Sequence, residues 1–303
     1  MRYSGNNIKL MVDNMMINYT DAGPEEAPVI ICIHGFPLNM SMWDKQVSVL
    51  IEHFRVITYD IRGHGGSDVG NEAFSIDLFV ADLIGFMNVL NLDKVSLCGL
   101  SMGGYIALKA IEGFPARFEA LVLCDTTCMA DSPEAKEKRM KAVESIIQHG
   151  VAQYADASIK NFFPQDSFTT SPEIITSVRE MIMKTSELSL CSTLLALSSR
   201  RETGTKIADI QVPVLILVGS NDVITPLSAA TFMHDNITKS TLQVIDHAGH
   251  LSNMENSEEF NRHLKLFFNS VYADHLKISQ GGDSSILREL RYKLNMLLSF
   301  RSI

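Results

Sequence analysis

The sequence has little of several features that mark specialised classes of protein. It holds 26 Lys and Arg against 35 Asp and Glu, which gives a formal net charge of −9. A basic surface is what nucleic-acid binding needs, so this balance argues against nucleic acid as the main partner. No apolar run approaches the length needed to cross a bilayer, and the N-terminal stretch shows no continuous apolar segment of a signal peptide. We therefore expect a globular, cytoplasmic protein with no transmembrane segment.

Cysteine is also scarce, and its spacing does not form an even, closely spaced framework. The chain has five cysteines, namely Cys32, Cys98, Cys124, Cys128 and Cys191. Three of them lie inside the apolar runs "VIICI", "VSLC" and "LVLC", a pattern typical of small buried hydrophobic side chains rather than of disulfides or metal ligands. This usage favours a reducing compartment.

What the sequence does have is a regular alternation of apolar and amphipathic segments. Short apolar runs at 29–34, 54–60, 94–99 and 120–125 predict buried strands, and the longer amphipathic stretches between them predict helices. Continuous apolar strands separated by helices indicate parallel βαβ units with both faces of the sheet covered. Two alternating segments, 8–12 and 15–20, predict an antiparallel pair at the start. The fold class is therefore α/β, with a mostly parallel central sheet flanked by helices.

The strand pattern stops between residues 128 and 210, where every segment reads as helix. The strand pattern returns after Pro213, so we expect a helical insertion at 128–210 in a core made of 1–127 and 211–270. A further segment, 271–303, carries an amphipathic helix with four leucines on one face: Leu287, Leu290, Leu294 and Leu297. That helix is expected to dock on its own body or on a second subunit, which would make it a route to self-association; its basic residues leave a membrane-surface or partner-binding role open.

The pentapeptide Gly99-Leu100-Ser101-Met102-Gly103 fits the pattern G-x-S-x-G. A predicted strand enters it and a predicted helix leaves it, so Ser101 stands on a sharp turn that exposes its Oγ at the carboxyl edge of the sheet. Gly99 and Gly103 are needed because side chains there would collide across the turn. The helix that follows directs its N-terminal amides toward the same place. The alternative is a turn serine beside a tightly packed helix.

A serine nucleophile needs a histidine base, and the histidine needs a carboxylate. His250, in "VIDHAGHLSN", follows a late predicted strand and is the best-placed base; His247 is its rival. Asp222 follows the buried strand in "VLILVGSND" and is the predicted acid, with Asp125 as the alternative. The order Ser101, Asp222, His250 is the one expected for a nucleophile-elbow hydrolase.

The segment "ICIHGFPLN" predicts the remaining part of such a site, an oxyanion hole. Gly35 follows a central strand and lets the backbone come close, so that the backbone amides of Phe36 and Met102 would be the two donors. His34 is a possible extra base, although a role in shaping the loop is the interpretation that we favour.

At this point the sequence resembles the α/β-hydrolase fold family. The motifs "HGFP", "YDIRGHGGSD", "GLSMGG", "GSND" and "HAGH" come in the family's order and spacing over 8–127 and 211–269. "GLSMGG" and "HAGHLSNMENSEEFN" look most like the 3-oxoadipate enol-lactonase and small carboxylesterase branches. The resemblance implies nucleophile Ser101, acid Asp222, base His250, oxyanion amides at Phe36 and Met102, and a helical lid at 128–210. It also implies that no metal or cofactor is required and that the loop 60–65 is structural.

Differences between this sequence and other branches of the family limit the reactions that we expect. Haloalkane dehalogenases and epoxide hydrolases carry Asp where this chain has Ser101, C–C hydrolases usually have Asn where it has Leu100, and proline iminopeptidases typically have Trp where it has Met102. We expect hydrolysis of a small carboxylic ester, lactone or thioester through an acyl-enzyme. Acyl transfer to an alcohol or amine uses the same triad and is one alternative, and a non-catalytic receptor that keeps the fold is another.

The substrate pocket is expected between the elbow and the lid. The loop residues near the motifs predict a largely apolar lining. They are Phe36, Met40, Trp43, Met102, Val223 and Leu251. For each of them, ordinary packing in the core is an equally good interpretation. A substrate with carboxylates would need a basic lid residue, and four arginines are candidates, although each is more often a solvated helix charge: Arg139, Arg179, Arg200 and Arg201.

Overall fold

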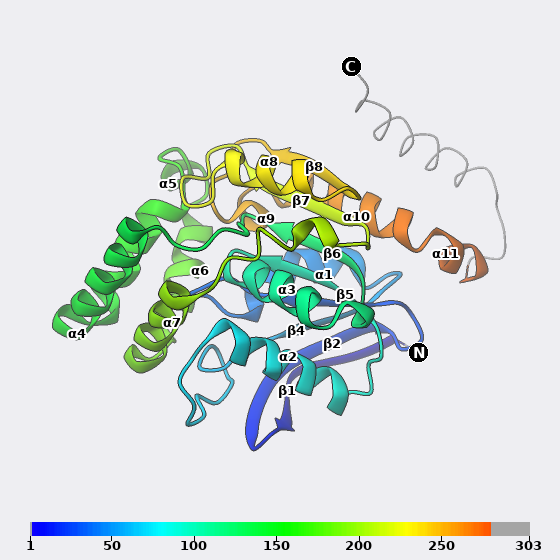
Figure 1. Ribbon diagram of the computed structural model, residues 1–303, viewed down its shortest axis with the longest axis horizontal. Helices are drawn as coiled ribbons and strands as arrows, with labels where there is room; N and C mark the ends of the chain where they lie inside the picture. Colours follow the sequence, from blue (N-terminus) through cyan, green and yellow to red (C-terminus); the bar gives the residue numbers. More distant parts are fainter. Residues whose placement is uncertain (1, 280–303) are drawn as a thin grey trace.

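A computed structural model describes residues 2–279 of the chain and shows one central sheet of eight strands (Figure 1). The strands lie in the order β1-β2-β4-β3-β5-β6-β7-β8 across the sheet. They are β1 (Arg2–Val12), β2 (Met15–Pro24), β3 (Val29–Ile33), β4 (Arg55–Tyr59), β5 (Val95–Leu100), β6 (Phe118–Cys124), β7 (Val214–Gly219) and β8 (Ser240–Ile245).

The sheet is parallel from β4 to β8 and antiparallel only at its start. β1 pairs with β2, and β2 with β4, in antiparallel fashion, while the other neighbouring pairs are parallel. The predicted antiparallel pair is thus present, in a register that sets Leu10 opposite Ile17. The predicted α/β class with a mostly parallel sheet is confirmed.

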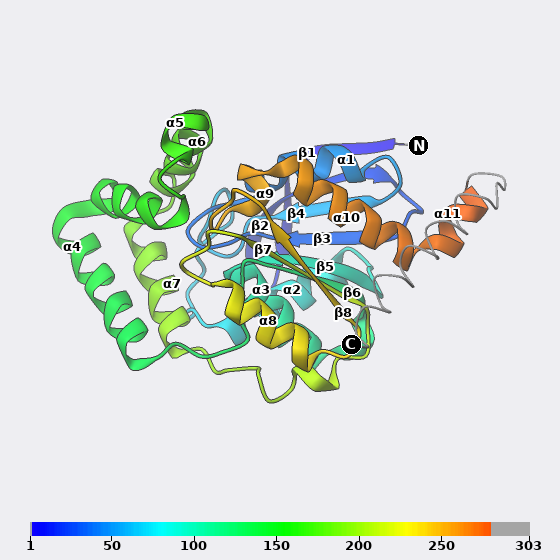
Figure 2. The same ribbon diagram turned by 90° about the horizontal axis from the view of Figure 1, so that it is seen from above.

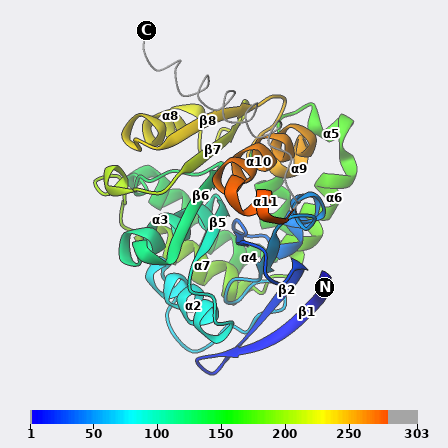
Figure 3. The ribbon, with the colours of Figure 1, turned by 90° about the vertical axis from the view of Figure 1, so that its right-hand side faces the viewer.

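Helices cover both faces of the sheet, as Figures 2 and 3 show from above and from the side. One face carries α2, α3 and α8, and the other carries α1 and α10. The helical elements are η1 (Met40–Trp43), α1 (Asp44–Leu50), α2 (Ile76–Val89), α3 (Met102–Gly113), η2 (Pro115–Arg117), α4 (Pro133–Phe162), α5 (Ser167–Thr170), α6 (Pro172–Met183), α7 (Glu187–Ser199), η3 (Ile207–Asp209), α8 (Leu227–Asn236), α9 (Ser252–Glu255), α10 (Ser257–Val271) and α11 (Ala273–Ser279).

The double covering explains why the parallel strands are apolar without a break. Every residue of β5 and β7 is buried, because side chains of alternating direction enter one of two cores, one on each face of the sheet. Cys32, Cys98 and Cys124 are free thiols with no exposed surface, so the prediction that they act as small core side chains is confirmed.

Four helices, α4 to α7, form the segment between β6 and β7, and we call residues 128–210 the cap segment. It lies at one end of the molecule, while α11 and the start of β1 lie at the other (Figures 1 and 2). The start of α4 follows capping rules, because Ser132 Oγ accepts a hydrogen bond from the amide of Ala135 and Pro133 opens the helix. Gly150, at φ 79°, interrupts the helical backbone of α4.

The chain beyond α10 continues to pack on the core. Tyr272 is buried and its hydroxyl donates a hydrogen bond of 2.8 Å to Glu119, although the predicted core ended at residue 270. The four leucines of the predicted amphipathic helix lie outside the described residues. Within residues 2–279, no helix combines the length and the apolar character needed to cross a membrane.

Candidate active site

Ser101 stands between β5 and α3, at the turn that the sequence pattern predicts. Its backbone has φ 52° and ψ −112°, a conformation that residues other than glycine rarely adopt and that stores strain. A Cβ on Gly99 would lie 2.3 Å from the carbonyl oxygen of Gly103, and a Cβ on Gly103 would lie 2.2 Å from that of Ile33. The first glycine therefore lets the turn close, and the second lets α3 lie against β3.

The three side chains predicted as nucleophile, base and acid form one chain of hydrogen bonds. His250 Nε2 lies 2.9 Å from Ser101 Oγ, and His250 Nδ1 lies 2.9 Å from Asp222 Oδ2. The residues come from three different strand ends, after β5, β7 and β8, so only the parallel sheet brings them together. Their exposed fractions are 8% for Ser101, 5% for Asp222 and 2% for His250. The geometry matches a nucleophile, a base and an acid that orients the base.

Asp222 is held as an ionised acceptor by its own loop. Its Oδ1 accepts hydrogen bonds from the amides of Ile224 and Thr225, and its Oδ2 accepts one from the Thr225 hydroxyl. Burial acts to raise the pKa of Asp222, but the charge of His250 and these hydrogen bonds outweigh it, so the pKa lies below its usual value. The carboxylate is ready to orient the imidazole and to stabilise its protonated form.

Asp125, the alternative acid, does not contact the histidine. Its Oδ1 accepts a hydrogen bond from the amide of Gly219, and its Oδ2 accepts one from the hydroxyl of Ser252. Burial raises the pKa of Asp125 well above its usual value, and the charge of Asp222 raises it further. Asp125 therefore ties the end of β7 to the segment after His250, and it is Asp222 that lies next to the imidazole.

The two rival histidines are placed elsewhere. His247 is exposed on the loop after β8. His34 is fully buried, with Nδ1 2.9 Å from the carbonyl oxygen of Gly35 and Nε2 accepting from the amide of Ile61. Burial lowers the pKa of His34 to about 4, so the ring is neutral and shapes the loop, which is the role that we favoured.

The two backbone amides predicted for the oxyanion hole are not engaged in hydrogen bonds within a helix. Met102 is the first residue of α3, a position whose N–H has no acceptor within the helix. Phe36 lies inside the turn closed by the amide of Leu38 on the carbonyl of Gly35. Gly35 permits the close approach, because a Cβ there would lie 3.0 Å from Leu100 Cδ2 and 3.3 Å from the carbonyl oxygen of Leu100.

Asp60 supports this turn from the loop 60–65, which the family resemblance marks as structural. Its Oδ1 accepts a hydrogen bond from the amide of Met40, and its Oδ2 accepts from Asn18 and from the amide of Gly66. The loop is thereby fixed between β2, β4 and the residues just after the predicted oxyanion turn.

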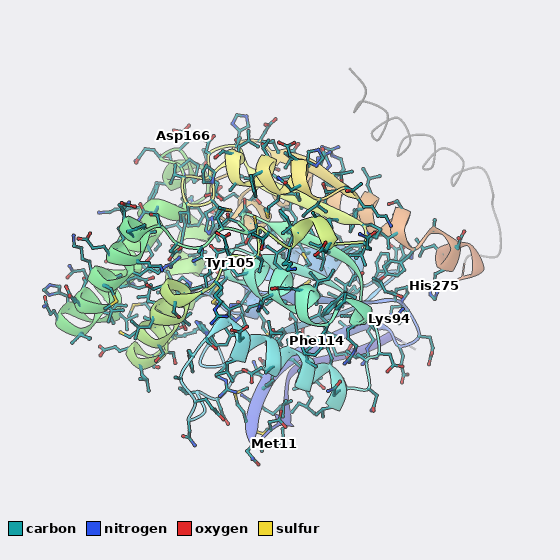
Figure 4. All side chains as sticks on the ribbon, viewed as in Figure 1. Met11, Lys94, Tyr105, Phe114, Asp166 and His275 are labelled. Carbon is teal, nitrogen blue, oxygen red and sulfur yellow. The ribbon has the colours of Figure 1, made fainter. Side chains whose placement is uncertain are left out.

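Two aromatic residues of the cap segment, which the sequence analysis did not single out, lie against this site. The Tyr154 ring lies 6.3 Å from Phe36, and the Phe162 ring stacks on the His250 imidazole at 5.9 Å. They are eight residues apart on one face of α4, and that spacing is the signal that could have found them. In Figure 4, Tyr105 of α3 lies on the side of the cap segment, and Phe114, directly after α3, lies farther from it.

The residues predicted to line the pocket divide into core and surface. Trp43 is fully buried with its ring 6.4 Å from that of Phe260, and Leu251 is 1% exposed in the same core, so both fit the core alternative. Met40 is also buried, whereas Val223 is 74% exposed. Three cavities among the described residues have volumes of about 210, 350 and 280 Å³. None of the three is lined by Ser101, Asp222 or His250.

The candidate arginines are mostly paired with carboxylates. Arg139 and Arg200 both bind Asp131, and Arg200 also lies over the Tyr105 ring at 4.2 Å. Arg179 pairs with Asp156 at 2.7 Å on the surface. Within residues 2–279, no group of His, Cys, Asp or Glu side chains is arranged to hold a metal ion.

A model of the Alpha/beta hydrolase family matches residues 30–263, which is more than half of the chain. The chain belongs to the alpha/beta hydrolase family.

Curated relatives of this α/β hydrolase include two enol-lactonases from Acinetobacter baylyi. 3-oxoadipate enol-lactonase 1 is 30% identical over 82% of the chain and 91% of its own length. 3-oxoadipate enol-lactonase 2 is 28% identical over 83% of the chain and 92% of its own length. Among solved structures, a thermophilic esterase from Thermogutta terrifontis matches with a TM-score of 0.82 and 32% identity, over 89% of the chain and 99% of its own. The likeness to the enol-lactonase branch is confirmed.

Proposed function

We propose that this α/β hydrolase cleaves a small carboxylic ester, lactone or thioester through an acyl-enzyme on Ser101. The observation that carries the proposal is the chain of two 2.9 Å contacts from Ser101 through His250 to Asp222, set on a strained strand-to-helix turn. Relatives named as enol-lactonases and an esterase support an ester-type bond as the target.

In the proposed reaction, His250 Nε2 takes the hydroxyl proton as Ser101 Oγ attacks the substrate carbonyl carbon. The carbonyl oxygen becomes an oxyanion held by the amides of Phe36 and Met102, and Asp222 stabilises the imidazolium through Nδ1–H. The imidazolium then gives its proton to the leaving alkoxide or thiolate, which departs and leaves the acyl group on Ser101. A water molecule repeats the sequence with His250 as base, which releases the acid and restores the serine.

The surroundings of the site support a compact, mostly apolar acyl group. Phe36, Tyr154 and Phe162 approach the proposed reaction centre as aromatic rings. The pairing of Arg139 and Arg200 with Asp131 leaves these arginines already engaged by a carboxylate. We accordingly propose that residues 128–210 act as the lid of the site and that neutral esters, lactones and thioesters belong to its substrates.

The test is labelling by a fluorophosphonate, which reacts with activated serines, combined with turnover of p-nitrophenyl acetate. We expect the label on the peptide that holds Ser101, and a loss of kcat/KM of at least about a thousandfold in Ser101→Ala. Wild-type turnover by Ser101→Ala, or the absence of label from Ser101, would contradict the proposal, and the latter would favour a receptor. A screen of esters, lactones and acyl-thioesters with added alcohols or amines separates hydrolysis from acyl transfer.

A further inference from the structure

Glu255 is a half-buried carboxyl group that bridges the loop of His250 and the cap segment. Its Oε1 accepts a hydrogen bond of 2.8 Å from the amide of Gly249, the residue directly before His250. Its Oε2 accepts one of 2.9 Å from the hydroxyl of Ser167, the first residue of α5. One carboxylate therefore holds two segments that lie more than 80 residues apart in the sequence.

The backbone of the same loop is also fastened to the end of α4. The amide of His250 donates a hydrogen bond of 2.8 Å to the carbonyl oxygen of Phe162, whose ring stacks on the imidazole. Gly249 fits there only as glycine, because a Cβ would lie 2.5 Å from that carbonyl oxygen and 2.9 Å from Pro164. Of two consecutive amides, that of His250 is thus held directly by α4, and that of Gly249 is held by Glu255, which is itself bound to Ser167 of the cap segment.

Glu255 takes no part in the proposed proton transfers. The two ring nitrogens of His250 already face Ser101 and Asp222, so Glu255 can act on the imidazole only through the backbone and through its charge. Burial raises the pKa of Glu255 to about 7, against the hydrogen bonds from Ser167 and Gly249 and the charge of His250. The amide of Gly249 and the hydroxyl of Ser167 supply the hydrogen bonds that this half-buried carboxyl group needs.

We propose that Glu255 is a positioning residue: it straps the loop of His250 to Ser167 of the cap segment and so keeps the imidazole in line between Ser101 and Asp222. The inference rests on the proposed function, because the base that it positions is the base of that reaction. If Glu255 has this role, the position of His250 depends on the cap segment as well as on its contacts with Ser101 and Asp222.

The experiment compares Glu255→Ala with Glu255→Gln, whose carboxamide can accept from Gly249 and donate to Ser167 without a charge. For Glu255→Ala we expect a fall in kcat of about 10- to 100-fold with p-nitrophenyl acetate and a KM near the wild-type value, as for a small misplacement of a reacting group. Glu255→Gln should recover kcat to within about fivefold of wild type. Glu258→Ala, an exposed neighbour on α10, is the matched control.

The other end of the strap is tested with Ser167→Ala against Ser177→Ala, an exposed serine of α6. Ser167→Ala should lower kcat by about three- to tenfold, and Ser177→Ala should leave it unchanged. Equal kcat in these two variants overturns the proposal, also when Glu255→Ala does not fold. A fall in Glu255→Gln as deep as in Glu255→Ala overturns it as well, because charge and not placement would then be the cause.

A readout that does not depend on turnover separates this inference from the proposed function. The low-field proton resonance of His250 Nδ1–H should be present in wild type, Glu255→Gln and Glu258→Ala, and should broaden or vanish in Glu255→Ala. If the resonance behaves in this way and no ester is cleaved, the proposed function fails and the strap stands. If it is unchanged in Glu255→Ala, the strap fails whatever the activity.

Discussion

At the scale of single residues, two neighbouring carboxyl groups show how surroundings assign different roles to the same side chain. Asp222 receives hydrogen bonds from its own loop and from His250, which keep it ionised. Asp125 is completely buried beside that charge, and the pKa of Asp125 is raised well above the usual value. Since two close carboxyl groups resist joint ionisation, the one that meets the histidine is the one that carries the charge.

This difference predicts opposite results for two matched substitutions. Asp222→Asn should lower kcat by about 10⁴-fold, because an amide in that place favours the wrong tautomer of His250. Asp125→Asn should keep kcat within about threefold, since the amide oxygen can accept from Gly219 and the amide nitrogen can donate to the Ser252 hydroxyl, which then no longer acts as the donor of this contact. Steady-state kinetics on both purified variants checks this. Inactivation by Asp125→Asn alone would reverse the assignment of the acid.

Glu255 predicts a specific pH dependence of stability. The pKa of Glu255 is raised from an ordinary 4.5 to about 7, so the folded protein binds this proton more tightly than the unfolded chain. Its stabilising contribution is therefore fully present below about pH 4.5 and is lost as the pH rises through about 7. His250 is the titratable group whose charge acts on it, in the opposite direction.

The measurement is the melting temperature of wild type and Glu255→Gln between about pH 5 and about pH 8. We expect the Tm of wild type to fall relative to that of the variant by about 2–4 °C over this range, because the amide does not titrate. A difference that stays constant with pH would show that Glu255 is ionised throughout and that its burial carries no penalty.

At the scale of elements, the close packing of α3 on β3 and β5 fixes the strained turn at Ser101. The helix approaches the sheet so closely that a Cβ on Gly103 would lie 2.2 Å from the carbonyl oxygen of Ile33. Gly104 is equally confined, with Thr126 at 2.4 Å from the place of a Cβ. The glycines therefore serve the contact between helix and sheet as well as the turn itself.

Two substitutions in the same helix test this contact. Gly103→Ala should destabilise the fold by about 1–3 kcal/mol or more, because α3 must move away from β3. Gly113→Ala, at the other end of α3 with no atom within 4 Å of the added Cβ, should be neutral or stabilise by up to about 1 kcal/mol. Urea unfolding of both variants measures the difference. Equal stability would mean that the helix can shift freely on the sheet.

At the scale of the whole molecule, the chain closes on itself beyond the predicted core. The Tyr272 ring lies 5.8 Å from that of Phe54, and its hydroxyl lies 2.7 Å from Ser96 Oγ and 2.8 Å from Glu119. The segment after α10 thus contacts the amino-terminal ends of β4, β5 and β6, the edge of the sheet opposite the candidate site.

Two truncations locate the end of the folded core. Removal of everything after Ser270 takes away Tyr272 and should reduce the free energy of unfolding by about 3 kcal/mol or more, as for the loss of a core aromatic side chain. Removal after Ser279 keeps Tyr272 and its contacts, so this chain should be more stable than the chain that ends at Ser270. Urea unfolding of both truncated chains measures their stability, and size-exclusion chromatography measures their oligomeric state. A change of oligomeric state on removal of everything after Ser279 would assign self-association to residues 280–303.

Much of the fold was predictable because its signals are local. The buried strands follow from apolar runs, the start of α4 follows from Ser132 and Pro133, and the turn at Ser101 follows from two glycines. The contacts of Tyr154 and Phe162 with the site were not predictable in the same way, since they depend on how the cap segment folds back over the sheet. Trp43 shows the same limit, because its place in a loop near a motif did not reveal that it is fully buried.

The sequence by itself determined the order of strands and helices along the chain, the elbow, the proposed nucleophile Ser101 and a short set of candidates for base and acid, because each depends on neighbours only a few residues away. Only the tertiary structure decided that Asp222 rather than Asp125 meets His250, and that Glu255 joins its loop to Ser167. Those choices depend on distances of about 3 Å between side chains from separate strand ends and from the cap segment. Packing of the whole chain sets such distances, and no local pattern encodes them.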